Sequence, residues 1–316
     1  MSKSILSWVA VIATLLFSSG AYAAVLVNDT WQDADRATPP SPMYSEMGID
    51  GDLDGDLESA WFNGGASTMS VSQGHLNKDL TGTSANWTTY FTPEGSEVNL
   101  ANHGDKLRVT WSFSLTGVAA ANTSQNLRLG IVNSIPANRL AADGVPPSGT
   151  AVAPYSGYAI FANMGAPTLG NSSPFQIRER VAQTGTNSIL GTTNDWAVGG
   201  LTGTTNGATA GNAGFAAGVT YTLLWEMTRN GPGIDIDATL SGGTYNTSGT
   251  GTIDANDPNG NGFVFDTFNV RPSSAAGTAE VFDTTLFRVE FIPIPEPATG
   301  GLACLAGLAL AAVRRR

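Results

Sequence analysis

The sequence predicts a single all-β domain, a jelly-roll sandwich of two packed sheets, and three observations indicate this fold. Apolar and polar residues alternate in several segments, as in strands with one buried face. Gly, Asn, Ser, Thr and Pro separate these segments, and Gly alone contributes 38 of the 316 residues. Hydrophobic residues make up 41% of the chain and charged residues only 13%, which suits a sandwich with a substantial core.

The clearest alternation covers 107–115, where every second residue is apolar. The same pattern predicts strands at 219–227 and 234–240, and a closing strand at 281–291. Trp111 and Trp225 lie at apolar positions of this alternation, so we expect both in the core. Shorter strands are expected at 127–132, 158–162, 175–181 and 263–270. Residues 199–218, rich in Gly, Thr and Asn, are expected to form a loop without a strand.

The N-terminal segment, 1–23, has the three parts of a secretory signal peptide. Lys3 precedes an apolar run over 5–17, and small residues at Ala21 and Ala23 form the expected cleavage site. Signal peptidase is therefore a predicted partner, with cleavage after Ala23 and one domain over 24–292. The alternative is a buried core helix.

The C-terminal segment, 293–316, combines a short motif, an apolar stretch and a basic end. Pro295, Glu296 and Pro297 come first, and 298–313 is apolar. As a helix these 16 residues span about 24 Å, which is short for a bilayer core of about 30 Å. The chain ends in Arg314, Arg315 and Arg316, which would hold such a helix on the cytoplasmic side.

This segment resembles the PEP-CTERM sorting signal of Gram-negative bacteria. The resemblance covers Pro295-Glu296-Pro297, the Gly/Ala/Leu stretch and the Arg cluster. It implies recognition by exosortase, a membrane cysteine protease, with processing near Pro297. It also implies transient anchoring in the inner membrane, followed by transfer to the envelope surface or an exopolysaccharide matrix. An ordinary tail anchor is the alternative.

The charge of the domain limits its partners. Residues 24–297 contain all 26 acidic residues and 11 of the 15 basic ones, so their net charge is 11 − 26 = −15. Such a domain repels nucleic acid and anionic lipid, which leaves divalent cations and neutral glycans as plausible partners. Cys304 is the one cysteine and lies in the apolar tail, so the domain has no disulfide and no Cys nucleophile.

A second resemblance concerns the domain itself, which is similar to exported bacterial concanavalin-like (laminin-G-like) sandwich modules. The similarity is one of spacing and residue type, at 29–36, 59–62, 86–91, 104–113 and 282–291. It implies carbohydrate binding at loops or on a concave sheet, often with a structural cation.

Acidic residues on alternate positions suggest a Ca²⁺ site. Asp50, Asp52, Asp54 and Asp56 share a loop with Gly51 and Gly55, and Ca²⁺ prefers oxygen ligands presented in this way. The loop is not an EF-hand, because Trp61 stands where the bidentate Glu would be. A solvated acidic insertion is the alternative.

A second motif repeats this spacing with Asp257, Asn259 and Asn261, followed by Gly262. Phe268 occupies the twelfth position, so a bidentate ligand is again missing. These residue types also form plain turns, which is the favoured interpretation, with Ca²⁺ binding as the alternative.

Four aromatic residues lie in polar or Gly-rich surroundings: Trp61, Trp87, Tyr90 and Trp196. Exposed on one face, they would form a platform on which sugar rings stack. Packing beneath loops is the favoured interpretation for each, with the glycan platform as the alternative.

The sequence gives little support for catalysis. His75 and His103 have no companion at metal-ligand spacing, and no Gly-x-Ser-x-Gly or Glu-x-Asp-x-x-Glu motif occurs. Asp235 and Asp237 share a strand face, which we expect to be exposed. We therefore expect an exported, non-catalytic protein that binds polysaccharide, with Ca²⁺ as a cofactor. A purely structural envelope or matrix protein is the alternative, and a glycan-active enzyme a remote one.

Overall fold

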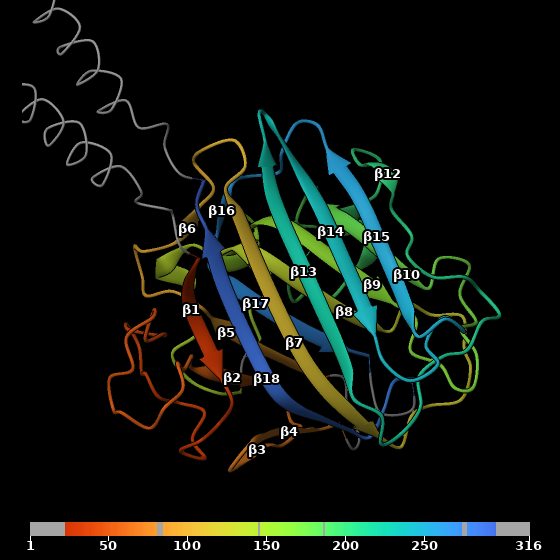
Figure 1. Cartoon of the computed structure of the whole chain (residues 1–316), viewed down its shortest axis with the longest axis horizontal. Coiled ribbons are helices and arrows are strands. Elements are labelled where there is room, and N and C mark those ends of the chain that lie inside the picture. Colours follow the sequence, from red (N-terminus) through yellow and green to blue (C-terminus); the bar gives the residue numbers. More distant parts are fainter. Residues whose placement is uncertain (1–22, 81–84, 145, 186, 274–276, 295–316) are drawn as a thin grey trace, which may run out of the picture.

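The computed structural model describes residues 23–80, 85–144, 146–185, 187–273 and 277–294, which form two stacked antiparallel sheets. Figure 1 shows β7, β13, β14, β15 and β18 in one layer, with β5, β8, β9 and β17 behind it. The predicted all-β sandwich is confirmed. The predicted apolar terminal helices, Ala21, and the sorting residues Pro295–Pro297 and Arg314–Arg316 lie outside the described residues.

Within the described part of the chain, the first sheet has nine strands. They run in the order β12-β15-β14-β13-β7-β18-β4-β3, and β1 also pairs with β18. Their bounds are β1 (Ala24–Asp29), β3 (Met69–Ser72), β4 (His75–Asp79), β7 (Lys106–Thr116), β12 (Thr202–Thr204), β13 (Tyr221–Asn230), β14 (Gly233–Ser241), β15 (Thr250–Asp257) and β18 (Val281–Ile292).

The second sheet has seven strands among the same residues, in the order β11-β10-β9-β8-β17-β5-β2. Their bounds are β2 (Trp61–Gly64), β5 (Asn86–Tyr90), β8 (Leu127–Asn133), β9 (Ser156–Ala162), β10 (Phe175–Arg180), β11 (Trp196–Ala197) and β17 (Thr267–Pro272). A small ribbon pairs β6 (Val98–Asn99) with β16 (Val264–Phe265). The described helices are the short 3₁₀ turns Pro136–Asn138, Gly149–Val152 and Thr193–Asp195. None of the helices in the described ranges has the length and apolar character needed to cross a membrane.

The strands predicted from alternation are present, with two differences. The segment 263–270 divides into β16 and β17, and 199–218 contains β12, so the expectation of a strand-free loop was wrong. β15 was missed because Gly251 and Ala255 occupy inward positions where larger apolar residues would have made the alternation visible.

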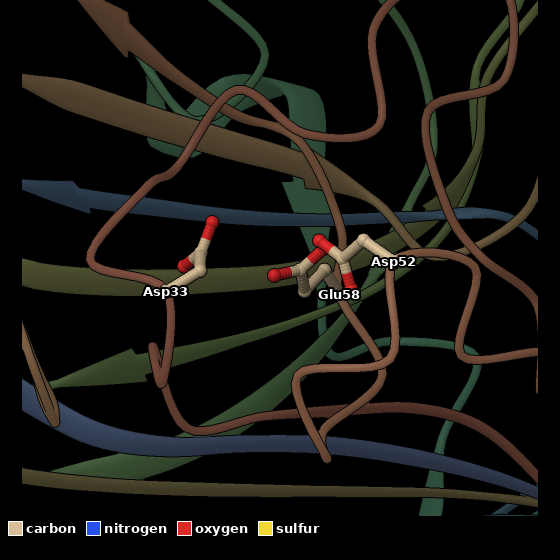
Figure 2. A group of neighbouring side chains, drawn as sticks. All are labelled: Asp33, Asp52 and Glu58. Carbon is tan, nitrogen blue, oxygen red and sulfur yellow. The ribbon is translucent and has the colours of Figure 1, made fainter.

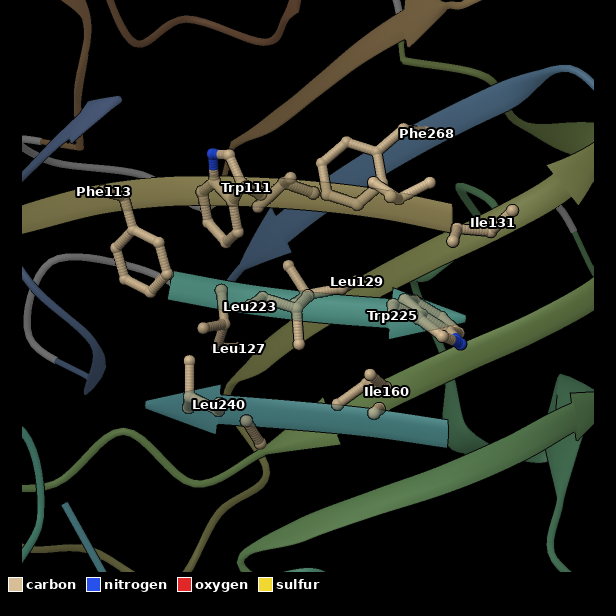
Figure 3. Close-up of a cluster of buried hydrophobic side chains, with 14 of the residues drawn as sticks. Trp111, Phe113, Leu127, Leu129, Ile131, Ile160, Leu223, Trp225, Leu240 and Phe268 are labelled. Carbon is tan, nitrogen blue, oxygen red and sulfur yellow. The ribbon is translucent and has the colours of Figure 1, made fainter. Parts of the chain in front are cut away.

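The core lies between the two sheets. Trp111 of β7 and Trp225 of β13 are fully buried, as predicted, and face apolar side chains of the second sheet (Figure 3). The Trp111 ring stacks on Phe113 at 4.0 Å between centroids and meets Phe268 of β17 edge-on at 5.9 Å. Its indole N–H donates to Thr284 Oγ1 over 3.2 Å, so burial leaves no polar atom of this side chain unpaired.

The two ends of the sandwich lie together. Ala24, the first residue of β1, pairs with Phe291 near the end of β18, and the Ile294 N–H donates to Asp105 Oδ1 over 3.0 Å. The main described core runs from Leu26 to Val289. Residues 23–294 therefore hold a closed core of their own and can be studied without the terminal segments.

Lys78 is an unusual inward-facing residue of β4. It is 1% exposed, and its ammonium group donates to Asn63 Oδ1 and to Ser67 Oγ. Burial lowers the pKa of Lys78 from an ordinary 10.5 to about 8. Nearby Asp143 acts in the opposite direction but does not offset the loss of solvation.

Lys78→Met should change how stability depends on pH. Between pH 8 and 10.5 the unfolded chain keeps a proton that folded Lys78 has lost, so this lysine makes stability rise with pH in that window. In urea unfolding, the free energy of unfolding of the wild type should therefore rise relative to that of the variant from about pH 7 to about pH 10. Between about pH 6 and about pH 7 both states hold the proton, so the difference should stay constant. A flat difference over the whole range would contradict the buried amine.

Candidate calcium site

The acidic loop, defined here as residues 46–58, lies against the start of the sandwich. Glu46 N–H donates to the Glu58 carbonyl over 3.1 Å, which closes the loop at its base. Asn28 and Leu57 exchange backbone hydrogen bonds of 2.8 and 3.4 Å, which fasten it to β1. The chain turns back at Leu53 and Gly55, whose φ angles are 68° and 104°. Gly accepts such a value without strain, and Leu53 adopts it at the exposed tip.

Carboxylates in the first half of this loop shape the loop itself. Asp50 Oδ1 accepts from Leu53 N–H over 2.6 Å, and its Oδ2 accepts from Gly55 N–H over 3.2 Å. Glu46 Oε1 and Oε2 accept from the N–H groups of Gly51 and Glu58 over 2.5 and 3.0 Å. These oxygens replace missing backbone partners in a turn, a common use of acidic side chains.

The second half of the loop presents carboxylate oxygens that nothing satisfies. Asp54 Oδ2, Asp56 Oδ1 and both oxygens of Glu58 are buried and have no hydrogen-bond partner among the described residues. Glu58 is only 3% exposed. Asp56 is held by its other oxygen, which accepts from Thr30 N–H and Oγ1 over 2.6 and 2.8 Å. A buried carboxylate without a partner is costly, so these oxygens call for a bound cation or a proton.

The spacing of these oxygens suits Ca²⁺. One oxygen each from Asp54, Asp56 and Glu58 lies within 4.8 Å of the others. Two oxygens bound to one Ca²⁺ at about 2.3–2.6 Å are at most about 5 Å apart, so the separations of the three oxygens are compatible with one shared ion. The donors are all carboxylates, the hard ligands that Ca²⁺ prefers and that Zn²⁺ sites rarely use alone.

Glu58 is shared with a second set of possible ligands. Figure 2 shows the carboxylates of Asp52 and Glu58 directed towards each other, with Asp33 beside them. Oxygens of Asp33, Asp52 and Glu58 also fall within 4.8 Å of one another, as do those of Glu46, Asp50 and Asp52. Glu58 therefore lies where carboxylates from two parts of the chain meet.

The electrostatics of the loop follow from this crowding. Burial, followed by repulsion from neighbouring carboxylates, raises the pKa of Glu58 from 4.5 to about 9. The neighbours are Asp33, Asp52, Asp54 and Glu46. Burial and then Asp56 also raise the pKa of Asp54. A divalent cation would remove both penalties at once, because it replaces the proton and attracts every carboxylate around it.

The sequence predicted part of this arrangement. Asp54 and Asp56 are in the group with unsatisfied oxygens, and Asp50 and Asp52 are in the adjoining group. Glu58, Glu46 and Asp33 were not among the predicted ligands. Glu58 continues the alternate spacing and could have been found from it, whereas Glu46 and Asp33 are brought in by the fold.

The second acidic motif forms a turn with internal partners. Asp257 Oδ1 accepts from Asn259 N–H over 3.0 Å, and its Oδ2 accepts from the Tyr158 hydroxyl over 2.7 Å. Asn261 N–H in turn donates to that hydroxyl oxygen over 2.8 Å. Both Asp257 oxygens therefore have donors, which is the arrangement expected of the favoured turn.

The prediction of an exposed aromatic platform is wrong. Trp61, Trp87, Tyr90 and Trp196 are 1%, 0%, 0% and 2% exposed, so none offers a ring face to a sugar. Trp61 and Trp87 pack edge-on against Phe287 and Phe282 of the other sheet, at 4.9 and 5.5 Å.

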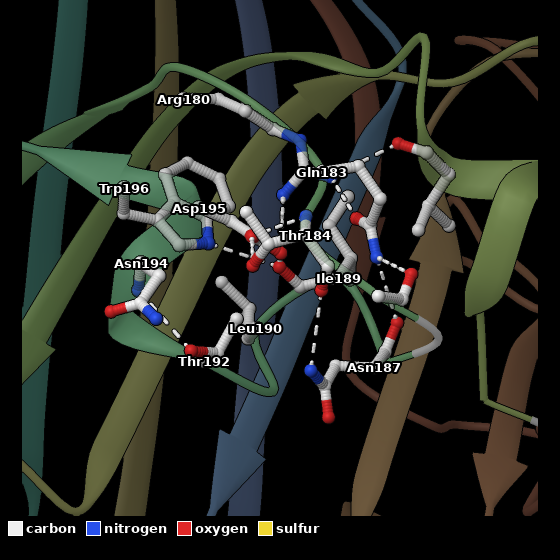
Figure 4. Close-up of polar contacts among 12 residues, drawn as sticks. Arg180, Gln183, Thr184, Asn187, Ile189, Leu190, Thr192, Asn194, Asp195 and Trp196 are labelled. Carbon is white, nitrogen blue, oxygen red and sulfur yellow. Dashed lines mark hydrogen bonds and ion pairs between the residues drawn. The ribbon is translucent and has the colours of Figure 1, made fainter.

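Tyr90 and Trp196 lie on the outer side of the second sheet but beneath covering segments. Tyr90 meets Tyr44 edge-on at 4.9 Å, and its hydroxyl accepts from Leu140 N–H over 2.8 Å. Trp196 donates its indole N–H to the Ile189 carbonyl over 3.0 Å, and the Arg180 guanidinium lies over its ring (Figure 4). The partners of Tyr90 are distant in the sequence and leave no local signal there, whereas Trp196 packs against its own segment.

The residues considered for catalysis lie at the surface. His75 is exposed and its Nδ1 lies 2.9 Å from Asp283, while His103 accepts from Gly231 N–H over 3.2 Å. Asp237 is exposed on the outer face of β14, as expected. Partial burial and then Asp254 raise its pKa.

No protein-family model and no curated protein matches this chain. Solved structures with some likeness include peanut lectin with a 9mer peptide (10% identity, TM-score 0.42), which covers 75% of this chain and 93% of its own. The metal-free lectin I-B4 from Griffonia simplicifolia (12%, TM-score 0.38) covers 73% and 92%. The CBM2 module of the Lactobacillus casei BL23 phage J-1 evolved Dit (9%, TM-score 0.38) covers 88% and 100%. Because these TM-scores are low, the assignment of the β-sandwich fold rests on the strand pairing of this chain and not on the likeness to these structures.

Glu58→Gln should separate the two occupants of the acidic loop, a proton and a cation. In EDTA the variant should melt at or above the wild-type temperature, because an amide carries no charge to bury. Added Ca²⁺ should stabilise the wild type by about 2.7 kcal/mol at a hundredfold excess over Kd, and the variant by much less. Thermal unfolding with and without Ca²⁺ measures both effects.

Glu94→Gln, which removes an exposed carboxylate outside the loop, serves as the control and should respond to Ca²⁺ like the wild type. A Ca²⁺ response of equal size in Glu58→Gln would contradict the assignment, as would a wild type that does not respond.

Proposed function

We propose that this chain is an exported, non-catalytic β-sandwich of the cell surface or extracellular matrix, stabilised by Ca²⁺, that binds polysaccharide. The observation that carries the proposal is the Glu58 carboxylate, buried with both oxygens unpartnered among other carboxylates. Such a site needs a cation or a proton, and a cation also neutralises the surrounding carboxylates. Extracellular modules bind Ca²⁺ with dissociation constants of about 10⁻⁴–10⁻³ M, so this requirement fits a protein that works outside the cell.

The arrangement of the two ends supports export and sorting. The expected cleavage site after Ala23 falls directly before β1, and the sorting motif begins directly after Ile294. Cleavage at both places would leave every described strand intact. The pairing of Ala24 with Phe291 also means that both terminal segments leave the sandwich from the same end. In a chain held in the membrane by its tail, that end of the sandwich would therefore face the membrane.

Burial of the four predicted aromatic residues bears on how a glycan could bind. Without exposed rings at these positions, recognition must rest on hydrogen bonds and charge instead of ring stacking. The same observation favours the second candidate, a structural matrix protein that recognises no sugar. Binding measurements distinguish the two.

Capture of polysaccharide is the direct test of the proposed function. Residues 23–294 should retain the exopolysaccharide of the producing organism in saturable fashion, in a panel that also holds neutral and acidic glycans. Glu58→Gln and EDTA should weaken capture near the unfolding temperature, because they act through stability, and much less at low temperature. No capture of any glycan by folded protein would favour the structural candidate.

Processing of the ends is tested on protein recovered from the producing cells. Mass spectrometry should find an N-terminus at Ala24 and no peptide from 298–316, because signal peptidase and an exosortase-type protease would have removed these segments. A variant with Ala23→Asp should keep its leader and serves as the control. Mature surface protein with an intact tail would contradict sorting by such a protease.

A further inference from the structure

Three arginines gather on the outer face of the second sheet and are called the arginine cluster below. Arg128 of β8 and Arg271 of β17 stand directly opposite each other in neighbouring strands. On its other side, Arg128 is paired with Phe161 of β9. Arg178 lies on the next strand, β10, two residues beyond the partner of Phe161. The guanidinium groups of Arg128 and Arg178 both lie over the Phe161 ring, each 4.7 Å from its centroid. The ring thus holds two like charges close together.

The cluster has no counter-charge of its own. Among the described residues, no carboxylate lies within ion-pair distance of Arg128, Arg178 or Arg271. Most other basic residues of the sandwich do have such a partner: Arg36–Asp143, Lys106–Glu226, Arg108–Glu226, Arg139–Asp266, Arg180–Asp195 and Arg288–Glu290. Like charges directly opposite each other in a sheet destabilise it. Three uncompensated arginines are therefore conspicuous in a region whose net charge is −15.

Neutral groups hold two of the three side chains in place. Arg128 donates to the carbonyl of Leu190 over 2.7 Å, and Arg178 donates to Gln125 Oε1 over 2.8 Å. The side chain of Arg271 makes no hydrogen bond or ion pair with the described residues. Burial, then repulsion from Arg271 and Arg178, lowers the pKa of Arg128 to about 10. An anion would relieve this repulsion.

A ligand can reach the cluster from one side. All three arginines are partly exposed. The adjoining part of the same face is covered by the segment that carries Leu190 and Trp196 (Figure 4). Leu190 lies over Gly130, two residues along β8 from Arg128, so the cluster stands at the edge of this cover.

We propose that the arginine cluster binds the carboxylate groups of an acidic polysaccharide, an inference that rests on the proposed function and names its ligand class. The guanidinium fork presents parallel N–H donors that match the two oxygens of a carboxylate. The Phe161 ring and the neutral acceptors hold Arg128 and Arg178 in advance, so little side-chain freedom is lost when the anion binds.

The charge elsewhere on the domain selects among polyanions. Duplex DNA carries one charge per about 1.7 Å of its axis and would meet the acidic remainder of the surface wherever it extended beyond the cluster. A polysaccharide with one carboxylate per sugar or per repeat has a lower charge density. It can place single carboxylates on the cluster while its hydroxyls face the rest of the sandwich.

The test compares two polymers that share one backbone and differ in whether each carboxyl group is ionised or methyl-esterified. Polygalacturonate and its fully methyl-esterified form are titrated by calorimetry into residues 23–294, in EDTA so that Ca²⁺ bridging plays no part. The wild type should bind the acid form and not the ester. Arg271→Gln should weaken binding roughly tenfold or more, since a hydrogen bond to a charged group contributes about 1.5–3 kcal/mol. Arg271→Lys, which keeps the charge but not the fork, should fall between them.

Arg288→Gln is the matched control, because it removes the same charge from β18 of the other sheet. It should bind the acid form like the wild type, and urea unfolding shows that each variant is folded. Equal loss in Arg288→Gln would overturn the inference, as would equal binding of acid and ester by the wild type. In that last case the proposed function stands and only the ligand class fails. No binding of either polymer overturns the inference, whereas the proposed function is decided separately by exopolysaccharide capture.

Further probes identify the source of the anion. Monomeric galacturonate should compete at high concentration and support a carboxylate site. Tighter binding of inorganic phosphate, of a sulfated glycan or of single-stranded DNA at equal charge would overturn the carboxylate assignment.

Discussion

The indole of Trp61 joins the core of the sandwich to its most charged region. The ring packs edge-on against Phe287 of the opposite sheet, and its N–H donates to Asp29 Oδ2 over 3.0 Å. Asp29 is buried beside Asp56, and burial raises the pKa of Asp29 well above its usual value. Packing between the sheets therefore fixes the base of the acidic loop, and any charge in that loop acts directly on the core. Binding of the proposed cation would be coupled to stability through this contact.

The sandwich leaves two kinds of charge without internal partners. Its ion pairs lie mainly on the first sheet, where Glu226 meets Lys106 and Arg108, and beneath the covering segments of the second sheet. The carboxylates of the acidic loop and the guanidinium groups of the arginine cluster do not form ion pairs with each other, because the loop is fixed to β1 of the first sheet and the cluster to β8, β10 and β17 of the second. They could meet only if strands came apart. Both are therefore satisfied best by something outside the chain, a cation in one case and an anion in the other.

The sequence predicted what depends on neighbouring residues and missed what depends on distant ones. Alternation identified β7, β13 and β14, and alternate aspartates identified the acidic loop. β15 escaped because Gly and Ala occupy its inward positions. Burial of Tyr90 depends on Tyr44 and Leu140, which are distant in the sequence, and the approach of Asp33 to Glu58 also depends on the fold. The arginine cluster is a matter of strand register: Arg128 and Arg271 are distant in sequence and meet only because β8 pairs with β17.

The proposed cation requirement would have a physical consequence for the proposed export of the chain. Without Ca²⁺, the Glu58 carboxyl can be buried only with its proton, and the crowded carboxylates around it weaken the folded state. A chain that crosses a membrane unfolded would be exported more easily if its folded state is less stable before export, and it would benefit from a more stable folded state afterwards. Binding of Ca²⁺ to the folded state alone supplies that difference by mass action, with no change in the strands themselves. The acidic loop would thus couple the final stability of the sandwich to the compartment in which it resides.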